Sequence, residues 1–357
     1  MINRVFKIAI FSIICFWVNA QDSPKNVILM IGDGMGLSQV SAAYYQATDE
    51  LHMTRMPVIG LMTTHSANDR VTDSAAAGTA LATGQKTNNG HLGVNPEGER
   101  IKNIAEYLKE SGYNIGLVAS CFLTHATPGA FFGHQISRNM YEEIAEDFIT
   151  SNIDIAIAGG SDHFNKRKSD KKNLIKDLEG NGYTIFLPKS KAMDELEFSA
   201  YEKVVYFTDP LHPPKKLKGR DWLPNATGIA LDFLKAKGGS GFFIMIEGSQ
   251  IDWAGHDNDI RYQVTETIDF DEAVGKALDF VESDGETLLI VLADHETGGM
   301  GINGVDKDNY IDAGWTTKGH TATMIPVFAY GPGSEAFGRL FDNIEVFQMI
   351  KALLLGE

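Results

Sequence analysis

The sequence predicts an α/β fold, a three-layer α/β/α sandwich around a largely parallel, mixed sheet. Along the 357 residues, short apolar runs alternate with stretches of helical periodicity. The runs are apolar at nearly every position, which is typical of strands that are buried on both faces. Burial on both faces requires helices on each side of the sheet, and this requirement gives the three layers.

The predicted elements begin with a strand over residues 26–31 and a helix that starts at Leu37. A helix over 101–111 then leads into a strand at 114–119. The alternation continues, with further strands expected at 153–158, 241–246, 287–293 and 326–330. About 337 residues remain after position 20, enough for one large domain or two smaller ones, and the sequence contains no repeat and no low-complexity segment. We expect residues 21–357 to form a single domain.

Residues 161–225 interrupt this rhythm and are rich in Lys, Asp and Pro. They include the basic runs 166–168 and 171–172. A binding patch is one interpretation of these runs, but charge runs usually face water. The sequence therefore predicts a solvated excursion from the core in this segment.

The first twenty residues have the pattern of a secretory signal peptide. Arg4 and Lys7 precede an apolar run over 8–18, and small residues end the pattern before Gln21. A membrane anchor is the alternative, but the run is shorter than the roughly 20 residues that a spanning helix needs. Lipid attachment at Cys15 is poorly supported, because the preceding residues are not small. We expect a secreted or periplasmic protein with no membrane span after removal of residues 1–20.

Removal of the signal would leave Cys121 as the only cysteine, so no intrachain disulfide could form. The formal net charge of the chain is −16, and loss of Arg4 and Lys7 makes it more negative. Such a surface would repel nucleic acid and anionic membranes. It would also repel an anionic substrate, so binding one requires a concentrated local positive charge. Metal ions would supply that charge.

Ligand-like side chains follow several strands, where the chemistry of open α/β sheets gathers. The strand at 26–31 leads into the segment GDGMG, residues 32–36. A dinucleotide-binding turn is the alternative here, but the glycine spacing differs from that motif and Asp33 would repel a pyrophosphate. Asp33 is better suited to hold a cation.

Acid and histidine residues recur after the later strands. Asp252 and His256 are four residues apart, which places them on one face of a helical turn. Asp294 and His295 directly follow the strand at 287–293, and His320 precedes the last strand. Carboxylate oxygens and imidazole nitrogens suit zinc. We expect the other histidines to be ordinary surface or core residues: His52, His65, His91, His134, His163 and His212.

Ser74 is the candidate nucleophile. It follows Asp73 and precedes a run of alanines, so it lies at or near a helix N-terminus, where backbone N–H groups favour an anion. The alternative is that Asp73 or Ser74 is only an N-cap. The metal clusters elsewhere favour the nucleophile, because a serine oxygen needs activation to attack phosphorus.

Together these segments resemble the alkaline phosphatase family. The resemblance runs from about residue 26 to 333 and rests on GDGMG at 32–36, TDSA at 72–75, HATP at 125–128, SRN at 137–139, EGSQIDWAGH at 247–256, DH at 294–295 and His320. It implies hydrolysis of phosphate monoesters to alcohol and inorganic phosphate through a covalent phosphoserine. It also implies small-molecule substrates, no specific nucleic-acid partner and a homodimer, although no sequence feature indicates a dimer.

The resemblance also assigns roles to single residues. Ser74 would be phosphorylated, and Arg138 would grip two phosphate oxygens with its planar fork. One Zn²⁺ would be held by Asp252, His256 and His320, and a second by Asp33, Asp294 and His295. A Mg²⁺ site would use Asp33, Thr127 and Glu247.

Two positions depart from many family members, which have Asp where this chain has His125 and Lys where it has Trp253. Both positions lie near the expected substrate and magnesium sites. Mg²⁺ prefers oxygen ligands, so we expect the third site to bind it weakly or to accept zinc or cobalt.

Three other functions use similar residues. A phosphodiesterase on a related metal core commonly has a Thr nucleophile and lacks the arginine, whereas this chain has Ser74 and Arg138. A sulfatase needs a Cys/Ser-x-Pro-x-Arg segment, which is missing from the sequence. A non-catalytic zinc- or phosphate-binding protein would need the ligands but not Ser74, and turnover of a phosphate monoester distinguishes it.

Overall fold

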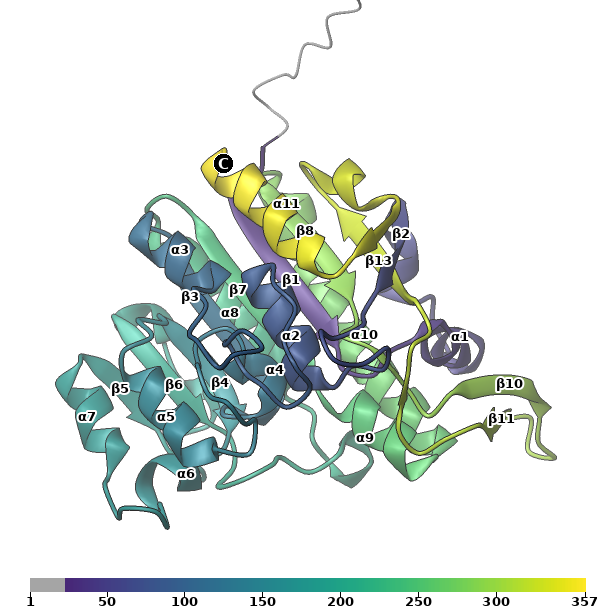
Figure 1. The fold of residues 1–357 in the computed structure, drawn as a ribbon, viewed down its shortest axis with the longest axis horizontal. Coiled ribbons are helices and arrows are strands. Elements are labelled where there is room, and N and C mark those ends of the chain that lie inside the picture. Colours follow the sequence, from purple (N-terminus) through teal and green to yellow (C-terminus); the bar gives the residue numbers. More distant parts are fainter. Residues whose placement is uncertain (1–22) are drawn as a thin grey trace, which may run out of the picture.

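The computed structural model describes residues 23–357, in which ten strands form one central sheet covered by helices on both faces (Figure 1). The strands lie in the following order across the sheet: β14 (Leu340–Asp342), β2 (Val58–Thr63), β13 (Ile325–Tyr330), β8 (Thr287–Leu292), β1 (Asn26–Gly32), β7 (Phe242–Gly248), β3 (Asn114–Phe122), β4 (Ile155–Gly159), β6 (Lys203–Phe207) and β5 (Tyr183–Phe186). The predicted signal peptide, residues 1–20, lies outside the described part of the chain.

The helices form the two outer layers. Figure 1 shows α2, α3 and α11 in front of the sheet and α8 and α10 behind it. The helices are α1 (Leu37–Gln46), α2 (Ser74–Thr83), α3 (Ile104–Glu110), α4 (Ala126–Gly129), α5 (Tyr141–Ile149), α6 (Asp162–Asn165), α7 (Leu174–Gly180), α8 (Leu223–Lys237), α9 (Gln250–Asp257), α10 (Ile260–Asp284) and α11 (Ile344–Leu355).

The sheet is largely parallel but mixed, which confirms the predicted fold class. Strand β1 pairs in parallel with both β7 and β8, whereas β13 is antiparallel to β2 and β8. All residues of β1, β7 and β8 are buried, because helices cover both faces of these strands. The carboxyl ends of β1, β7 and β8 therefore lie side by side.

The predicted helix at 101–111 is shorter in the structure. Helix α3 begins only at Ile104, because Asn103 accepts a hydrogen bond from the Glu106 backbone and Glu106 reaches back to the Asn103 backbone. This reciprocal capping fixes the first turn. The cap therefore decides the start of the helix, which apolar periodicity alone does not determine.

The segment 161–225 is part of the sheet. Strand β6 pairs in parallel with β4, and β5 forms the edge beside it. The lysines of the two basic runs are exposed, as expected, but Arg167 between them is buried and pairs with Glu146 and Asp170. Apolar side chains of the segment join the main core, so the prediction of an excursion applies only to its loops.

Two small antiparallel pairs lie outside the main sheet. Strands β10 (Met300–Val305) and β11 (Ile311–Trp315) form a hairpin beside α1 (Figure 1). The short strands β9 (Glu296–Thr297) and β12 (His320–Thr321) pair so that His320 lies opposite Thr297. Among residues 23–357, every helix is too short or too polar to cross a membrane.

Candidate metal centre and nucleophile

Three groups of potential metal ligands gather at the carboxyl ends of the central strands. Asp33 directly follows β1, Glu247 lies within β7, and Asp294 comes two residues after β8. In each group the ligand atoms lie within 4.8 Å of one another. The groups are Asp252, His256 and His320; Asp33, Asp294 and His295; and Cys121, His125 and Glu247.

The first group combines one helix with a distant strand. Asp252 and His256 lie one turn apart on α9, and the pairing of β12 with β9 brings His320 to them. Nε2 of His256 lies 3.2 Å from Oδ2 of Asp252, and Nε2 of His320 lies 3.3 Å from Oδ1. The two Nε2 atoms are 3.3 Å apart. Three donor atoms thus face one point, as a tetrahedral zinc site requires.

Backbone carbonyls orient both imidazoles of this group. Nδ1 of His320 lies 2.8 Å from the carbonyl of Thr72, and Nδ1 of His256 contacts the carbonyl of Lys318. Because a carbonyl only accepts hydrogen bonds, each Nδ1 must donate. The hydrogen bond to Asp252 raises the pKa of His256 to about 9 in the metal-free protein. A bound metal would replace the proton on Nε2, and each neutral ring would then offer the lone pair of Nε2 to the metal, as metal-binding histidines do.

The second group is completely buried. Nε2 of His295 lies 3.5 Å from Oδ1 of Asp33 and 3.3 Å from Oδ2 of Asp294. Neither carboxylate oxygen of Asp33 has a hydrogen-bond partner among the described residues. Oδ1 of Asp294 accepts hydrogen bonds from the backbone of Gly34 and His295, which leaves Oδ2 free. Buried carboxylates without partners are costly, and a divalent cation would remove the cost.

Electrostatics supports the same conclusion. Burial, together with the charge of Asp252, raises the pKa of Asp294 to about 6. Burial and the neighbouring acids also raise the pKa of Asp33 well above its usual value. Burial likewise raises the pKa of Glu247 to about 7. A cation would reverse these shifts by stabilising the charged carboxylates, so the residues fit a site for divalent metals.

Ser74 is the first residue of α2 and lies against the second group. Its Oγ is 3.2 Å from Nε2 of His295. The N-cap is Asp73, whose carboxylate accepts a hydrogen bond from the Ala76 backbone. The other oxygen of Asp73 accepts one from Arg138 at 3.0 Å. Asp73 thus performs the capping that was the alternative role for Ser74, and Ser74 is left facing the ligands.

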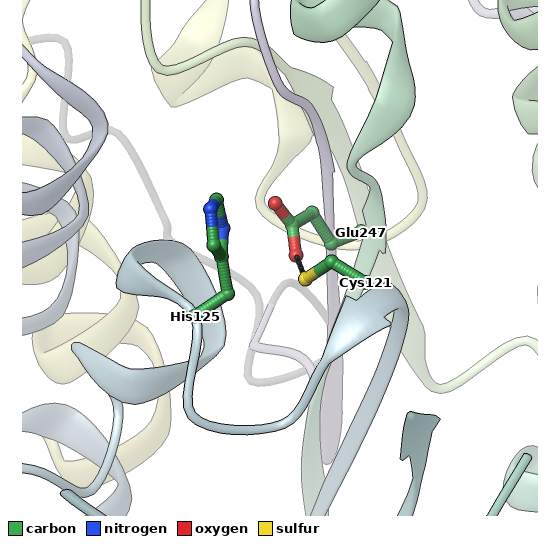
Figure 2. A group of neighbouring side chains, drawn as sticks. All are labelled: Cys121, His125 and Glu247. Carbon is green, nitrogen blue, oxygen red and sulfur yellow. Dashed lines mark hydrogen bonds between the residues drawn. The ribbon is translucent and has the colours of Figure 1, made fainter. Parts of the chain in front are cut away.

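The third group lies between β3, β7 and the start of α4 (Figure 2). His125 is the N-cap residue of α4, and Thr127 lies in its first turn. Oε1 of Glu247, Nδ1 of His125 and Oγ1 of Thr127 are buried and have no hydrogen-bond partner among the described residues. Cys121, near the end of β3, donates a long hydrogen bond of 3.4 Å to Oε2 of Glu247.

Cys121 belongs to this group although the sequence does not predict it as a site residue. The one available signal in the sequence is its position four residues before His125. The spacing alone is not informative, because His125 lies beyond the end of the strand. Only the contact with Glu247, on another strand, identifies Cys121 as a neighbour of the site.

An aromatic group flanks the third site. The ring of Trp253 lies 6.1 Å from that of His125, measured between ring centroids. Phe122 stacks on His212 at 3.9 Å and meets His163 edge-on at 4.7 Å. The sequence predicts ordinary roles for His163 and His212, but both lie next to the site: His163 contacts Phe122, and the ring centroid of His212 lies 5.6 Å from that of His125. Neither belongs to a metal-ligand group of the described residues.

Comparison with known proteins agrees with this geometry. The sequence profile of the family described as alkaline phosphatase matches residues 24–312. Alkaline phosphatase 3 of Bacillus subtilis (strain 168) is 34% identical, over 93% of this chain and 90% of the relative. The solved alkaline phosphatase of the Antarctic bacterium TAB5 is 41% identical, with a TM-score of 0.89, over 93% of this chain and 98% of that chain.

A second structure of the Antarctic protein is a histidine-to-aspartate variant, described as having Mg bound in its M3 site. It is 40% identical, with a TM-score of 0.88, over 93% of this chain and 98% of that chain. The profile covers most of the chain, and relatives above 30% identity align along nearly all of it. The chain therefore belongs to the alkaline phosphatase family, the metal-dependent enzymes that hydrolyse phosphate monoesters.

Proposed function

We propose that this chain hydrolyses phosphate monoesters by transferring the phosphoryl group first to Ser74 and then to water. The observation that carries the proposal is the position of the Ser74 hydroxyl, 3.2 Å from His295 and beside an arginine held by Asp73. A nucleophile, metal ligands and a phosphate-binding cation thus meet at the N-terminus of α2, which itself favours an anion.

We assign one Zn²⁺ to Asp252, His256 and His320, and another to Asp33, Asp294 and His295. When bound, these ions supply Lewis-acid charge that lowers the pKa of a hydroxyl and neutralises phosphate oxygens. The mixed oxygen and nitrogen donors of both groups are the usual zinc ligands.

The protein residues then perform two displacements. In the first, Oγ of Ser74 forms a bond to phosphorus, the bond to the ester oxygen breaks, and the alcohol leaves with a proton. In the second, a water oxygen bonds to phosphorus, the bond to Ser74 breaks, and the serine regains its proton. Arg138 holds two non-bridging oxygens with parallel N–H groups throughout, while Asp73 fixes its orientation.

We assign the third site to Asp33, Thr127 and Glu247, with His125 and Trp253 beside it. An imidazole in this site disfavours Mg²⁺, which prefers oxygen ligands in octahedral geometry. The magnesium described in the M3 site of the histidine-to-aspartate variant of the Antarctic relative supports this assignment.

The test combines metal analysis with two assays on the same preparation. We expect two tightly bound Zn²⁺ per chain, and faster hydrolysis of a chromogenic phosphate monoester than of the matching diester. Preferred hydrolysis of the diester would identify a phosphodiesterase. No turnover with zinc fully loaded would identify a binding protein and overturn the proposal.

We further propose that residues 1–20 are a signal peptide that directs the protein to the periplasm or the exterior, and that residues 21–357 form one domain. One continuous hydrophobic core includes residues from Val27 to Ile350, which supports a single domain. N-terminal sequencing of the exported protein tests the cleavage before Gln21. Light scattering of the purified protein tests the homodimer.

A further inference from the structure

We propose that Cys121 is a ligand of the third metal site, which makes this site selective for a thiophilic divalent ion such as Zn²⁺ or Co²⁺. The inference rests on the proposed function, because it concerns a metal site of the same centre. It goes beyond the proposed function, because it predicts a metal–sulfur bond from a residue that is not among the third-site ligands Asp33, Thr127 and Glu247.

The geometry brings three different donor atoms together (Figure 2). Cys121 is the penultimate residue of β3, His125 follows at the start of α4, and Glu247 projects from β7. Sγ of Cys121 lies 3.4 Å from Oε2 of Glu247. The donor atoms of all three residues lie within 4.8 Å of one another, so one ion could contact sulfur, nitrogen and oxygen together after small side-chain adjustments.

Several buried polar atoms around this point have no hydrogen-bond partner among the described residues. Nδ1 of His125 and Oε1 of Glu247 are buried without a hydrogen-bond partner among the described residues, as is Oγ1 of nearby Thr127. Glu247 is fully buried, and His125 is only 8% exposed. Buried groups of this kind cost free energy unless they are paired. A cation among them would satisfy the histidine nitrogen and the carboxylate oxygen at once.

The donor chemistry selects the kind of ion. Sulfur, imidazole nitrogen and carboxylate oxygen are the ligands of zinc and of similar transition metals. Mg²⁺ requires hard oxygen ligands, so Cys121 and His125 both act against it. When the metal–sulfur bond forms, the S–H bond breaks and its proton passes to solvent. The hydrogen bond from Cys121 to Glu247 is then replaced by shared contact with the ion.

The alternative is that Cys121 is a small buried side chain whose thiol makes weak hydrogen bonds to Glu247 and to the carbonyl of Phe122. Both roles predict a buried, unreactive thiol in the metal-free protein. They differ in the state with three metals bound, because only a ligand forms a bond from sulfur to the metal.

The experiment is a titration of metal-stripped protein with Co²⁺, followed by absorption spectroscopy. We expect the third equivalent to produce a near-ultraviolet sulfur-to-cobalt charge-transfer band. Cys121→Ala should lose this band. Its third site should also bind Co²⁺ more weakly by at least roughly 10- to 100-fold, which is the usual effect of removing a residue that only supports a metal ligand. Cys15 belongs to the proposed signal peptide, so Cys121 is the only thiol that can give the band in the processed protein.

The proposal can be refuted with wild-type protein alone, so the test remains valid even if the Cys121 variants misfold. Three bound Co²⁺ per chain without a charge-transfer band would show that Cys121 is not a ligand. A band that persists in Cys121→Ala, or in the more conservative Cys121→Ser, would exclude Cys121 as its source.

A monoester assay on the wild-type protein separates this proposal from the proposed function. Monoester hydrolysis without the band would refute only the sulfur ligand. The band without any monoester hydrolysis would refute the proposed function and leave the metal–sulfur bond standing.

Discussion

Asp73 connects the start of α2 to the proposed phosphate-binding arginine. One of its carboxylate oxygens accepts the Ala76 N–H at 2.9 Å, and the other accepts a hydrogen bond from Arg138 at 3.0 Å. A single side chain therefore sets both the position of Ser74 and the direction of Arg138. Because Asp73 caps the helix, the hydroxyl of Ser74 is not needed for capping and remains available as the nucleophile.

Replacing Ser74 with Ala should abolish the covalent phosphoenzyme and lower monoester hydrolysis by several orders of magnitude, because the two-step route is lost. Metal content should stay the same, because the carboxylates and imidazoles that are proposed to hold the two zinc ions are unchanged. The measurement is the amount of labelled phosphate that stays on the protein when its reaction with labelled substrate is quenched with acid. Ser66→Ala is the control, because the Ser66 hydroxyl bonds only to its neighbours Asn68 and Asp69. Label retained by Ser74→Ala would identify a different nucleophile.

Replacing Arg138 with Ala should slow monoester hydrolysis by roughly 10- to 100-fold, as the loss of hydrogen bonds to a charged group predicts. Diester hydrolysis should fall less, because a diester lacks one of the charged oxygens that the fork would hold. Arg138→Lys keeps the charge but not the paired donors, so it should recover only part of the rate. An unchanged ratio of monoester to diester activity would show that Arg138 does not hold the phosphate.

Replacing His125 with Asp should tighten magnesium binding by at least about tenfold, because a carboxylate adds negative charge and a hard ligand. The melting temperature should also rise with magnesium, since an ion that binds only the folded state stabilises it. Both quantities are followed while zinc-loaded protein is titrated with magnesium. Equal affinities in wild type and variant would place His125 outside the third site.

At the scale of elements, the turn from β1 into α1 depends on a glycine. Gly34 has a φ of +75°, and a Cβ there would lie 2.7 Å from Cα of Asp252 and 2.7 Å from Oγ1 of Thr297. Thr297 in turn donates a hydrogen bond to Asp252. The close approach of this turn to α9 and β9 therefore holds the two proposed zinc sites together.

Replacing Gly34 with Ala should separate these elements and lower zinc occupancy and activity together. Gly182→Ala is the matched control, because Gly182 has a φ of +84° but open space around its missing Cβ. Both variants should lose about 1–2 kcal/mol through the left-handed conformation. Only Gly34→Ala should lose metal, as measured by elemental analysis and thermal unfolding. Normal zinc content in Gly34→Ala would show that the turn tolerates the displacement.

At the scale of the whole molecule, the metal-free protein carries buried acids in its centre. Burial raises the pKa of Asp294 to about 6 and that of Glu247 to about 7, and also raises that of Asp33. The folded state therefore retains protons that the unfolded chain has already released. Where the folded state binds more protons, the free energy of unfolding falls as pH rises. Burial lowers the pKa values of His125 and His295, which acts in the opposite sense. The hydrogen bond to Asp252 raises the pKa of His256 to about 9 and, against the effect of burial, also raises that of His320, which acts in the same sense as the carboxyls.

Metal removal should therefore destabilise the protein more at higher pH. We expect the difference in melting temperature between metal-loaded and metal-stripped protein to grow from about pH 5 to about pH 8, because the carboxyls lose their protons in this interval. Metal binding itself strengthens in the same direction, since the ligands must be deprotonated. Thermal unfolding with and without a chelator measures the difference. A constant difference would mean that the buried carboxyls keep their ionisation state on metal loss.

The fold class, the main strands and the family can all be predicted from the amino-acid sequence, because these depend on local patterns. Uninterrupted apolar runs reveal strands buried on both faces, and the residues after them, such as Asp33 and Asp294, are candidates for a site at the strand ends. These signals are contained within short windows of the chain. No knowledge of the strand order is needed to detect them.

Which of these residues meet depends on the order and pairing of the strands. The placement of β1 between β7 and β8 brings Asp33 to Asp294, and the pairing of β9 with β12 brings His320 to Asp252. The contact of Cys121 with Glu247 depends in the same way on the pairing of β3 with β7. Strand order and pairing result from packing between segments that are far apart in sequence, which hydrophobic periodicity does not report.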